Sequence, residues 1–264
     1  MQLIAASKMR RAQQMVQEGR AYANYIREVV ADLVALVSLE EEGVVTPLLA
    51  VRPVQRTLLL TITPDRGLAG ALVSNINRIA ATAIRTSESP VSAVAVGRKG
   101  TQFMTRTRQD LRATFSVSDR PRLEDTVAVS RLVQEQFLSG EADRVLIAYT
   151  EFVNTAVQRA VIRTLLPVEP AEQQTQDEAG YIYEPSPQVV LDSLVPRYVE
   201  TQVYHAILES IASEHSARMV AMKNATDNAN ELVDDLTLAL NKARQEQITT
   251  ELLDVVGGAA AVAR

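Results

Sequence analysis

Both ends of the chain carry apolar residues at the spacing of a helix that pairs with another helix. Towards the C-terminus, small or apolar residues recur every three or four positions, at Met222, Ala225, Ala229, Leu232, Leu236, Ala239 and Ala243. The N-terminal segment repeats this alternation at Met15, Glu18, Tyr22, Tyr25, Val29, Leu33 and Leu36, where only Glu18 is out of character. Such alternation is typical of a coiled-coil seam. We therefore predict that the two segments form a long antiparallel coiled coil in which alanines face tyrosines.

Proline and glycine are distributed so that both segments can be long helices. All ten prolines lie between Pro47 and Pro196, and residues 197–256 contain no glycine. A proline inside a helix costs about 3 kcal/mol or more. A straight helix over residues 197–256 would be roughly 90 Å long, which exceeds the diameter of a globule of this chain length. We predict an N-terminal coiled-coil helix over residues 1–46, a domain over residues 47–190 and a C-terminal coiled-coil helix over residues 191–264.

The middle of the chain alternates short apolar runs with helical patterns. Strand formers cluster at residues 57–63, 91–96 and 144–150, and helical spacing covers residues 68–85 and 125–137. This order predicts an α/β domain with a mostly parallel sheet covered by helices. A further strand over residues 156–166 follows a short turn, which favours an antiparallel edge. The acidic stretch of residues 169–187 is expected to be an exposed loop.

Composition narrows the possible chemistry. The chain has a formal charge of −5, which disfavours nucleic-acid binding through a generally basic surface. It has no cysteine, which excludes disulfides, thiolate metal sites and thiol nucleophiles. No apolar run is long enough to span a bilayer and no secretory signal is recognisable, so we expect a soluble, cytoplasmic protein.

Candidate sites in the sequence are few. Gly67-Leu-Ala-Gly70 follows a strand and opens a helix, where a phosphate could bind, but a tight turn needs the same glycines. Gly97-Arg-Lys-Gly100 could hold a small anion or form an ordinary solvated loop. His205 and His215 are ten residues apart, which does not suit a helical metal site. We expect no catalytic residue, metal or cofactor.

The two chain ends leave alternatives open. The first segment is basic through Arg10, Arg11, Arg20 and Arg27, and a face that contacts a partner or solvent is favoured over a membrane-surface helix. Residues 255–263 are small and almost uncharged. They are either a frayed terminus or a tip inserted into a partner.

Several stretches resemble the gamma subunit of the rotary ATP synthase over essentially the whole chain. They are residues 1–13 (MQLIAASKMRRAQ), 61–70 (TITPDRGLAG), 198–204 (YVETQVY), 213–229 (SEHSARMVAMKNATDNA) and 241–251 (NKARQEQITTE). The resemblance implies a Rossmann-like domain at the foot of a shaft made by the terminal helices. It also implies a non-catalytic central-stalk rotor that transmits torque between the membrane c-ring and the catalytic alpha-beta hexamer of a proton-translocating enzyme.

The resemblance further implies the partners and the contact residues. The partners would be the alpha, beta and epsilon subunits and the c-ring, with peripheral attachment at the cytoplasmic face of the energy-transducing plasma membrane. Contacts that couple rotor and hexamer would fall on Ala5, Ala6, Ser7, Lys8, Met9, Arg218, Gln245, Thr249, Glu251, Val255 and Val256. Family members usually have further helical residues before the position of Met1, and their Gly-Leu-Cys-Gly-Gly turn reads Gly-Leu-Ala-Gly-Ala at residues 67–71. A static coiled-coil adaptor and a small nucleotide-binding enzyme are the alternatives.

Overall fold

The computed structural model describes residues 2–40, 46–169 and 183–262, and divides the chain into two units. The first unit runs from Met1 to Val220 and the second from Ala221 to Arg264. This differs from the predicted three-part division, because the first helix, the sheet and the beginning of the last helix share one core. Most of the predicted acidic loop, residues 170–182, lies outside the described residues.

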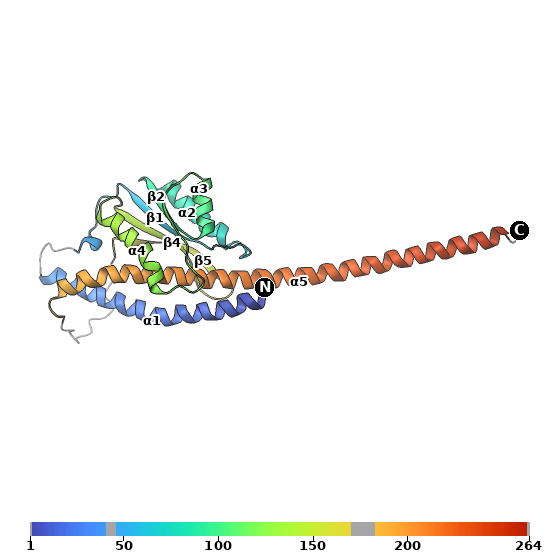
Figure 1. The fold of residues 1–264 in the computed structure, drawn as a ribbon, viewed down its shortest axis with the longest axis horizontal. Helices are drawn as coiled ribbons and strands as arrows, with labels where there is room; N and C mark the ends of the chain where they lie inside the picture. Colours follow the sequence, from blue (N-terminus) through green and yellow to red (C-terminus); the bar gives the residue numbers. More distant parts are fainter. Residues whose placement is uncertain (1, 41–45, 170–182, 263–264) are drawn as a thin grey trace. The chain divides into compact units, whose positions relative to one another are not determined.

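A five-stranded sheet forms the centre of the first unit (Figure 1). Its strands are β1 (Thr57–Ile62), β2 (Val91–Val96), β3 (Asp110–Phe115), β4 (Arg144–Phe152) and β5 (Gln158–Leu166). They lie in the order β3-β2-β1-β4-β5, and every pair is parallel except β4 with β5. The predicted mostly parallel sheet and its antiparallel edge are therefore confirmed.

The buried side chains of β1 separate two packed layers, because neighbouring residues of a strand point to opposite faces. Leu59 packs with α2 (Leu72–Thr86) and α3 (Arg98–Arg106). Leu58 and Leu60 pack in the larger core with α4 (Leu123–Leu138), α1 (Gln2–Glu40) and α5 (Pro187–Val262). A short 3₁₀ helix, η1 (Pro47–Leu49), joins the same core through Leu48.

The structure contains a helix and a strand that the sequence pattern did not predict. Residues 97–100 were expected to form a loop, but α3 begins at Arg98, and β3 follows it. The strand β3 alternates between exposed and half-buried residues, as an edge strand does. Its sequence, DLRATF, is too polar to stand out as a strand.

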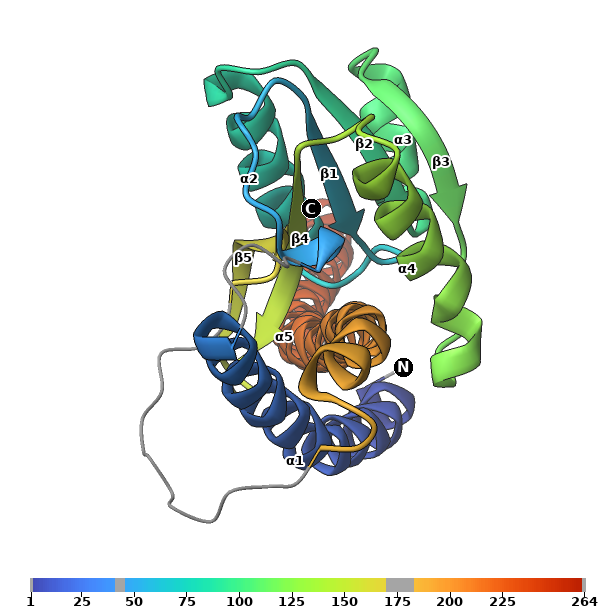
Figure 2. The same cartoon turned by 90° about the vertical axis from the view of Figure 1, so that its left-hand side faces the viewer.

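Within the first unit, α5 lies between α1 and the sheet (Figure 2). Almost every side chain from Val199 to Ser216 is buried or half-buried, because neighbours cover the helix on several sides. The helices α1 and α5 are antiparallel here, as predicted: Val16 packs with Leu208, and Val37 shares a core with Leu191.

The predicted coiled-coil seam is wrong in register and in partner segment. The buried face of α1 runs one position later than predicted at most steps. It comprises Ala5, Met9, Ala12, Val16, Ile26, Val30, Ala31, Leu33 and Val37. Of the predicted N-terminal set, Leu33 is fully buried, Met15 and Val29 are half-buried, and Tyr22, Tyr25 and Leu36 are exposed. The facing residues of α5 come from the stretch between Leu191 and Ala212. The predicted Met222–Ala243 set lies in the second unit, where all its members are exposed except the half-buried Met222.

Gly19 marks a close approach of α1 to α5. The Nε2 atom of His205 lies 2.7 Å from the Gly19 carbonyl oxygen. A Cβ atom at position 19 would lie 2.6 Å from the His205 ring carbon Cε1.

Gly19→Ala is therefore expected to destabilise the chain by about 1–3 kcal/mol, because it overpacks this crossing. Chemical denaturation of the full-length chain measures the effect. Ser7→Ala, at an exposed position of the same helix, is the control. Equal stability of the Gly19→Ala variant and the wild type would contradict the close packing of these two helices.

Candidate functional site

Three serines at three-residue spacing bring α5 against the end of β4. Ser213 Oγ donates to the Thr150 carbonyl oxygen at 3.1 Å, and Ser210 Oγ accepts from the Thr150 amide at 3.3 Å. One turn later, Ser216 Oγ donates to the carbonyl oxygen of Thr155 at 2.7 Å, in the turn between β4 and β5. Small side chains allow helix and strand to approach closely, so one side of α5 is fixed to the β4–β5 hairpin.

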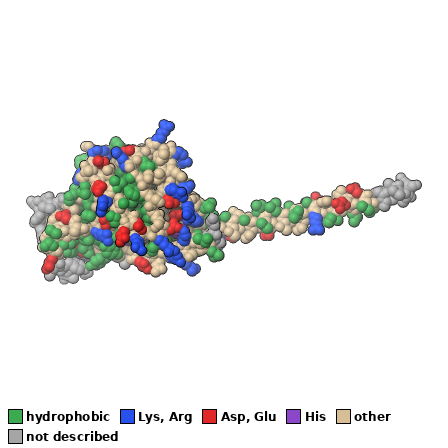
Figure 3. All heavy atoms as spheres, viewed as in Figure 1, with side chains coloured by type: hydrophobic (Ala, Val, Ile, Leu, Met, Phe, Trp, Pro, Cys, Tyr) green, Lys and Arg blue, Asp and Glu red, His purple; other side chains and the backbone are tan. Residues whose placement is uncertain are grey.

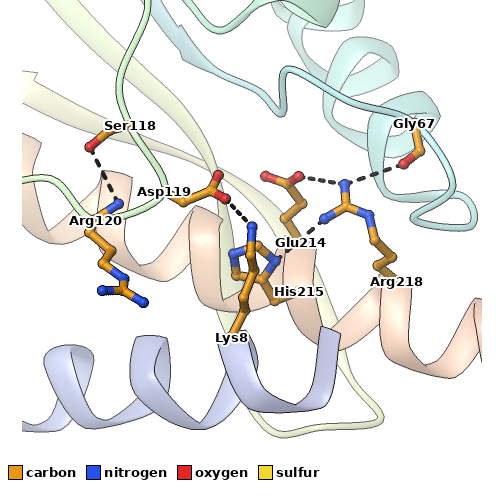
Figure 4. A network of polar contacts seen from close by, with 8 residues as sticks. All are labelled: Lys8, Gly67, Ser118, Asp119, Arg120, Glu214, His215 and Arg218. Carbon is orange, nitrogen blue, oxygen red and sulfur yellow. Dashed lines mark hydrogen bonds and ion pairs between the residues drawn. The ribbon is translucent and has the colours of Figure 1, made fainter. Parts of the chain in front are cut away.

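Arg218 connects the same helix to the turn between β1 and α2. Its Nη2 donates to Glu214 Oε1 at 2.5 Å and to the Gly67 carbonyl oxygen at 3.2 Å. Its Nη1 lies 3.4 Å from His215 Nδ1. Figure 4 shows the guanidinium surrounded by these three groups. A guanidinium can only donate, so Nδ1 of His215 is the acceptor and the ring is neutral.

Burial controls the protonation of both neighbours of Arg218. The pKa of His215 is lowered to about 4, chiefly because the imidazole is buried; Asp119 opposes the shift, and the positive charges of Arg218 and Lys8 add to it. Burial also raises the pKa of Glu214, although the hydrogen bond from Arg218 opposes the increase. The ion pair between Arg218 and Glu214 is largely shielded, with side-chain exposures of 14% and 12%.

A second ion pair fixes the beginning of α1. Lys8 Nζ donates to Asp119 Oδ2, in the loop between β3 and α4 (Figure 4). This hydrogen bond is the main reason that the pKa of Asp119 is lowered. The side chains of Lys8 and Asp119 keep 39% and 54% of their surface in solvent, so the pair adds little stability.

These groups line a cavity of about 760 Å³ at the carboxyl ends of β1 and β2. In open α/β sheets this edge commonly binds ligands. Here the polar groups of the wall bond largely to one another, and Arg218 uses its donors within the chain. The arrangement therefore joins two helices to the sheet.

The Gly97–Gly100 segment is a structural junction. The amides of Arg98, Lys99 and Gly100 donate to Asp65 Oδ1, the Pro64 carbonyl oxygen and Thr63 Oγ1, at 2.8, 3.1 and 2.7 Å. These first amides of α3 are the donors that an anion would need. These amides already donate within the chain, which argues against a small-anion site at this segment.

Other kinds of site find no support within the described ranges. His205 contacts Gly19 and His215 contacts Arg218, so the two histidines have separate surroundings. Residues 2–40, 46–169 and 183–262 contain no cluster of three or more His, Asp or Glu side chains suited to a metal ion. No helix in the described part of the chain has the length and apolar character needed to cross a membrane.

The predicted coupling residues fall into two groups. In the first unit, Ala5 and Met9 are buried, Ala6 and Lys8 are half-buried, Ser7 is exposed, and Arg218 bonds within the unit. Buried side chains cannot be the primary contacts with another subunit, which corrects the prediction for Ala5 and Met9. In the second unit every predicted residue is exposed, namely Gln245, Thr249, Glu251, Val255 and Val256.

The second unit is a stretch of α5 with apolar side chains in solvent (Figure 3). Part of this apolar surface recurs every four residues, at Leu232, Leu236, Leu240, Ile248, Leu252 and Val256, with Arg244 interrupting the series. An α-helix has 3.6 residues per turn, so each residue of this series lies about 40° further around the helix than the one four positions before it. The apolar surface therefore faces different directions along the helix.

Sequence comparison identifies close relatives over the whole chain. The family model described as ATP synthase matches residues 1–262. The ATP synthase gamma chain of Dehalococcoides mccartyi strain CBDB1 is 56% identical over 264 residues, which cover 100% of this chain and 92% of that protein. The ATP synthase gamma chain of Roseiflexus castenholzii is 48% identical over 268 aligned positions, with coverage of 100% and 91%.

Solved structures show the same fold. A chain from the central stalk and c-ring of the Tetrahymena thermophila mitochondrial ATP synthase aligns with a TM-score of 0.66 and 23% identity, covering 86% of this chain and 97% of that chain. A chain of the Euglena gracilis mitochondrial ATP synthase aligns with a TM-score of 0.61 and 21% identity, with coverage of 97% and 95%. The structures support the fold, and the sequence relatives carry the assignment: the chain belongs to the gamma-chain family of the ATP synthases.

Proposed function

We propose that this chain is the central-stalk rotor of a proton-translocating ATP synthase and transmits torque between the membrane c-ring and the catalytic alpha-beta hexamer. The apolar series from Leu232 to Val256, which changes direction along the second unit, supports this role most directly. Ligands shift a conformational equilibrium only through contacts that differ between states. A helix whose apolar surface changes direction along its length offers different contacts to each of several equivalent sites around it.

We select the residues that would contact the hexamer by the exposure of their side chains. Gln245, Thr249 and Glu251 are exposed polar residues that we assign to the moving region of the beta subunits, and Val255 and Val256 to the bearing of the hexamer. Ser7 is the exposed candidate on α1. The chain would contribute no catalytic group and bind no cofactor.

The remaining partners are proposed from the family. The epsilon subunit and the c-ring would contact the α/β part of the first unit. Attachment to the membrane would be peripheral, through the complex alone, at the cytoplasmic face of the plasma membrane.

A reversible cross-link tests the rotor. The native chain has no cysteine, so Glu251→Cys introduces a unique thiol on this subunit, which oxidation can join in a disulfide to a cysteine placed in a beta subunit. We expect oxidation to abolish multi-turnover ATP hydrolysis by the assembled complex, and reduction to restore it.

The control for this experiment places a cysteine at Arg131, an exposed position on α4, with the same beta-subunit variant. Oxidation of this control should leave hydrolysis unchanged. Full activity of the Glu251→Cys complex while demonstrably cross-linked would refute the rotor and favour a static adaptor.

A further inference from the structure

We propose that Arg218 is a positioning residue that prevents α5 from rolling against the α/β part of the first unit, so that torque passes from the sheet into the helix. The inference rests on the proposed rotor function and adds to it the internal connection that the function requires. Arg218 then acts inside the chain rather than at its surface with the hexamer.

The position of Arg218 on α5 carries the argument. Ser216 fixes one side of the helix to the β4–β5 turn through the Thr155 carbonyl oxygen. Arg218 fixes the helix to the β1–α2 turn through the Gly67 carbonyl oxygen. Two residues along a helix correspond to a rotation of about 200°, so the two attachments lie on nearly opposite sides. Rolling in either direction would break one of them.

The apolar core alone is poorly suited to this task. The side chains of Val199, Val203 and Ile207 hold α5 against the sheet, but hydrophobic contact is non-directional and resists separation more than sliding. Hydrogen bonds depend on distance and angle, so they resist a change of orientation. The two turns that α5 contacts leave β1 and β4, which are neighbouring strands of the sheet.

Three acceptors fix the orientation of the Arg218 guanidinium. Glu214, one turn earlier on α5, accepts a hydrogen bond from Nη2, which also donates to Gly67. His215 accepts from Nη1. A planar guanidinium can serve three acceptors in a fixed arrangement, whereas the single ammonium of lysine lacks that geometry. The Lys8–Asp119 pair gives α1 a comparable connection, but both of its side chains are much more accessible to solvent than Arg218 and Glu214.

The test compares ATP hydrolysis with ATP-driven proton pumping in membrane vesicles that contain the assembled complex. For Arg218→Gln we expect pumping per ATP hydrolysed to fall severalfold while hydrolysis continues. Arg197→Gln removes another arginine of α5, one whose partners include Glu200 on the same helix and Tyr22 on α1, and should pump as the wild type does. The ratio is taken per ATP hydrolysed, so a smaller amount of assembled complex does not change it.

A charge swap separates the contact with Gly67 from the ion pair. The double variant Glu214→Arg/Arg218→Glu keeps opposite charges one turn apart, but a carboxylate at position 218 cannot donate to the Gly67 carbonyl oxygen. We expect the swap to pump as poorly as Arg218→Gln, and Arg218→Lys to recover pumping only in part.

Two results would overturn the inference: pumping by Arg218→Gln at the wild-type ratio, or full recovery in the charge swap, which would reduce Arg218 to a helix-stabilising residue. Failure of the rotor proposal looks different. In that case the Glu251→Cys cross-link has no effect on hydrolysis, whatever the Arg218 variants do.

Discussion

Alanine at position 97 is expected to prevent the first unit from folding stably. Gly97 has a φ of 91°, in the region that favours glycine, and an added Cβ would lie 1.9 Å from the Thr63 carbonyl oxygen. That oxygen belongs to backbone held by hydrogen bonds from the Thr63 amide and hydroxyl to the Val96 carbonyl oxygen. The backbone cannot move aside cheaply, so we expect a loss of more than about 4 kcal/mol.

The matched control is Gly140→Ala. Gly140 also has a positive φ, 74°, but a Cβ atom added there would have no neighbour within 4 Å. Only the backbone preference is lost there, which costs about 1–2 kcal/mol. Urea denaturation of the two full-length variants measures the difference. Similar midpoints for both would contradict the close approach of β1 to the start of α3.

Acidification from about pH 6.5 to about pH 4 is expected to destabilise the first unit through His215. The pKa of His215 is lowered from 6.5 to about 4 in the folded chain. Between these values the unfolded chain binds a proton that the folded chain excludes. The contribution is therefore fully present above pH 6.5 and is lost as the pH falls towards 4, by up to about 3 kcal/mol.

The neighbouring carboxyl groups change this profile in opposite directions. The lowered pKa of Asp119 adds a loss of stability at still lower pH, whereas the raised pKa of Glu214 means that protonation of Glu214 favours the folded chain. His215→Gln removes the imidazole and keeps a side-chain oxygen that can accept from Arg218. Unfolding free energies measured at pH 7 and about pH 4 should fall more steeply for the wild type than for this variant. Parallel profiles would contradict a buried neutral imidazole.

The sequence predicted those elements whose environment is uniform. β1 is buried on both faces and is mostly apolar, and the glycine-free C-terminal stretch is helical as expected. The edge strand β3 and the polar helix α3 were missed, since half-buried elements mix polar and apolar residues. The seam register failed at Tyr22 and Tyr25, where the aromatic rings suggested core positions while both side chains are exposed.

The connections around Arg218 could not have been found by local pattern. Arg218 and Gly67 are 151 positions apart, and Lys8 and Asp119 are 111 apart, so only the fold brings each pair together. The resemblance to gamma subunits drew attention to Lys8 and Arg218 but not to Asp119 or Glu214. One local signal existed: Ser210, Ser213 and Ser216 form a small-residue face that indicates close packing of a helix on another element.

The apolar side chains of the second unit also bear on the life of the chain before assembly. Leu238, Leu240 and Val255 are about 70% exposed, which is costly in water and favours self-association. Under the proposed rotor function, this surface of a newly made copy would stay in water until the hexamer covers it. Balanced synthesis of the subunits, or prompt capture by a chaperone, would shorten the time for which this apolar helix is exposed to water.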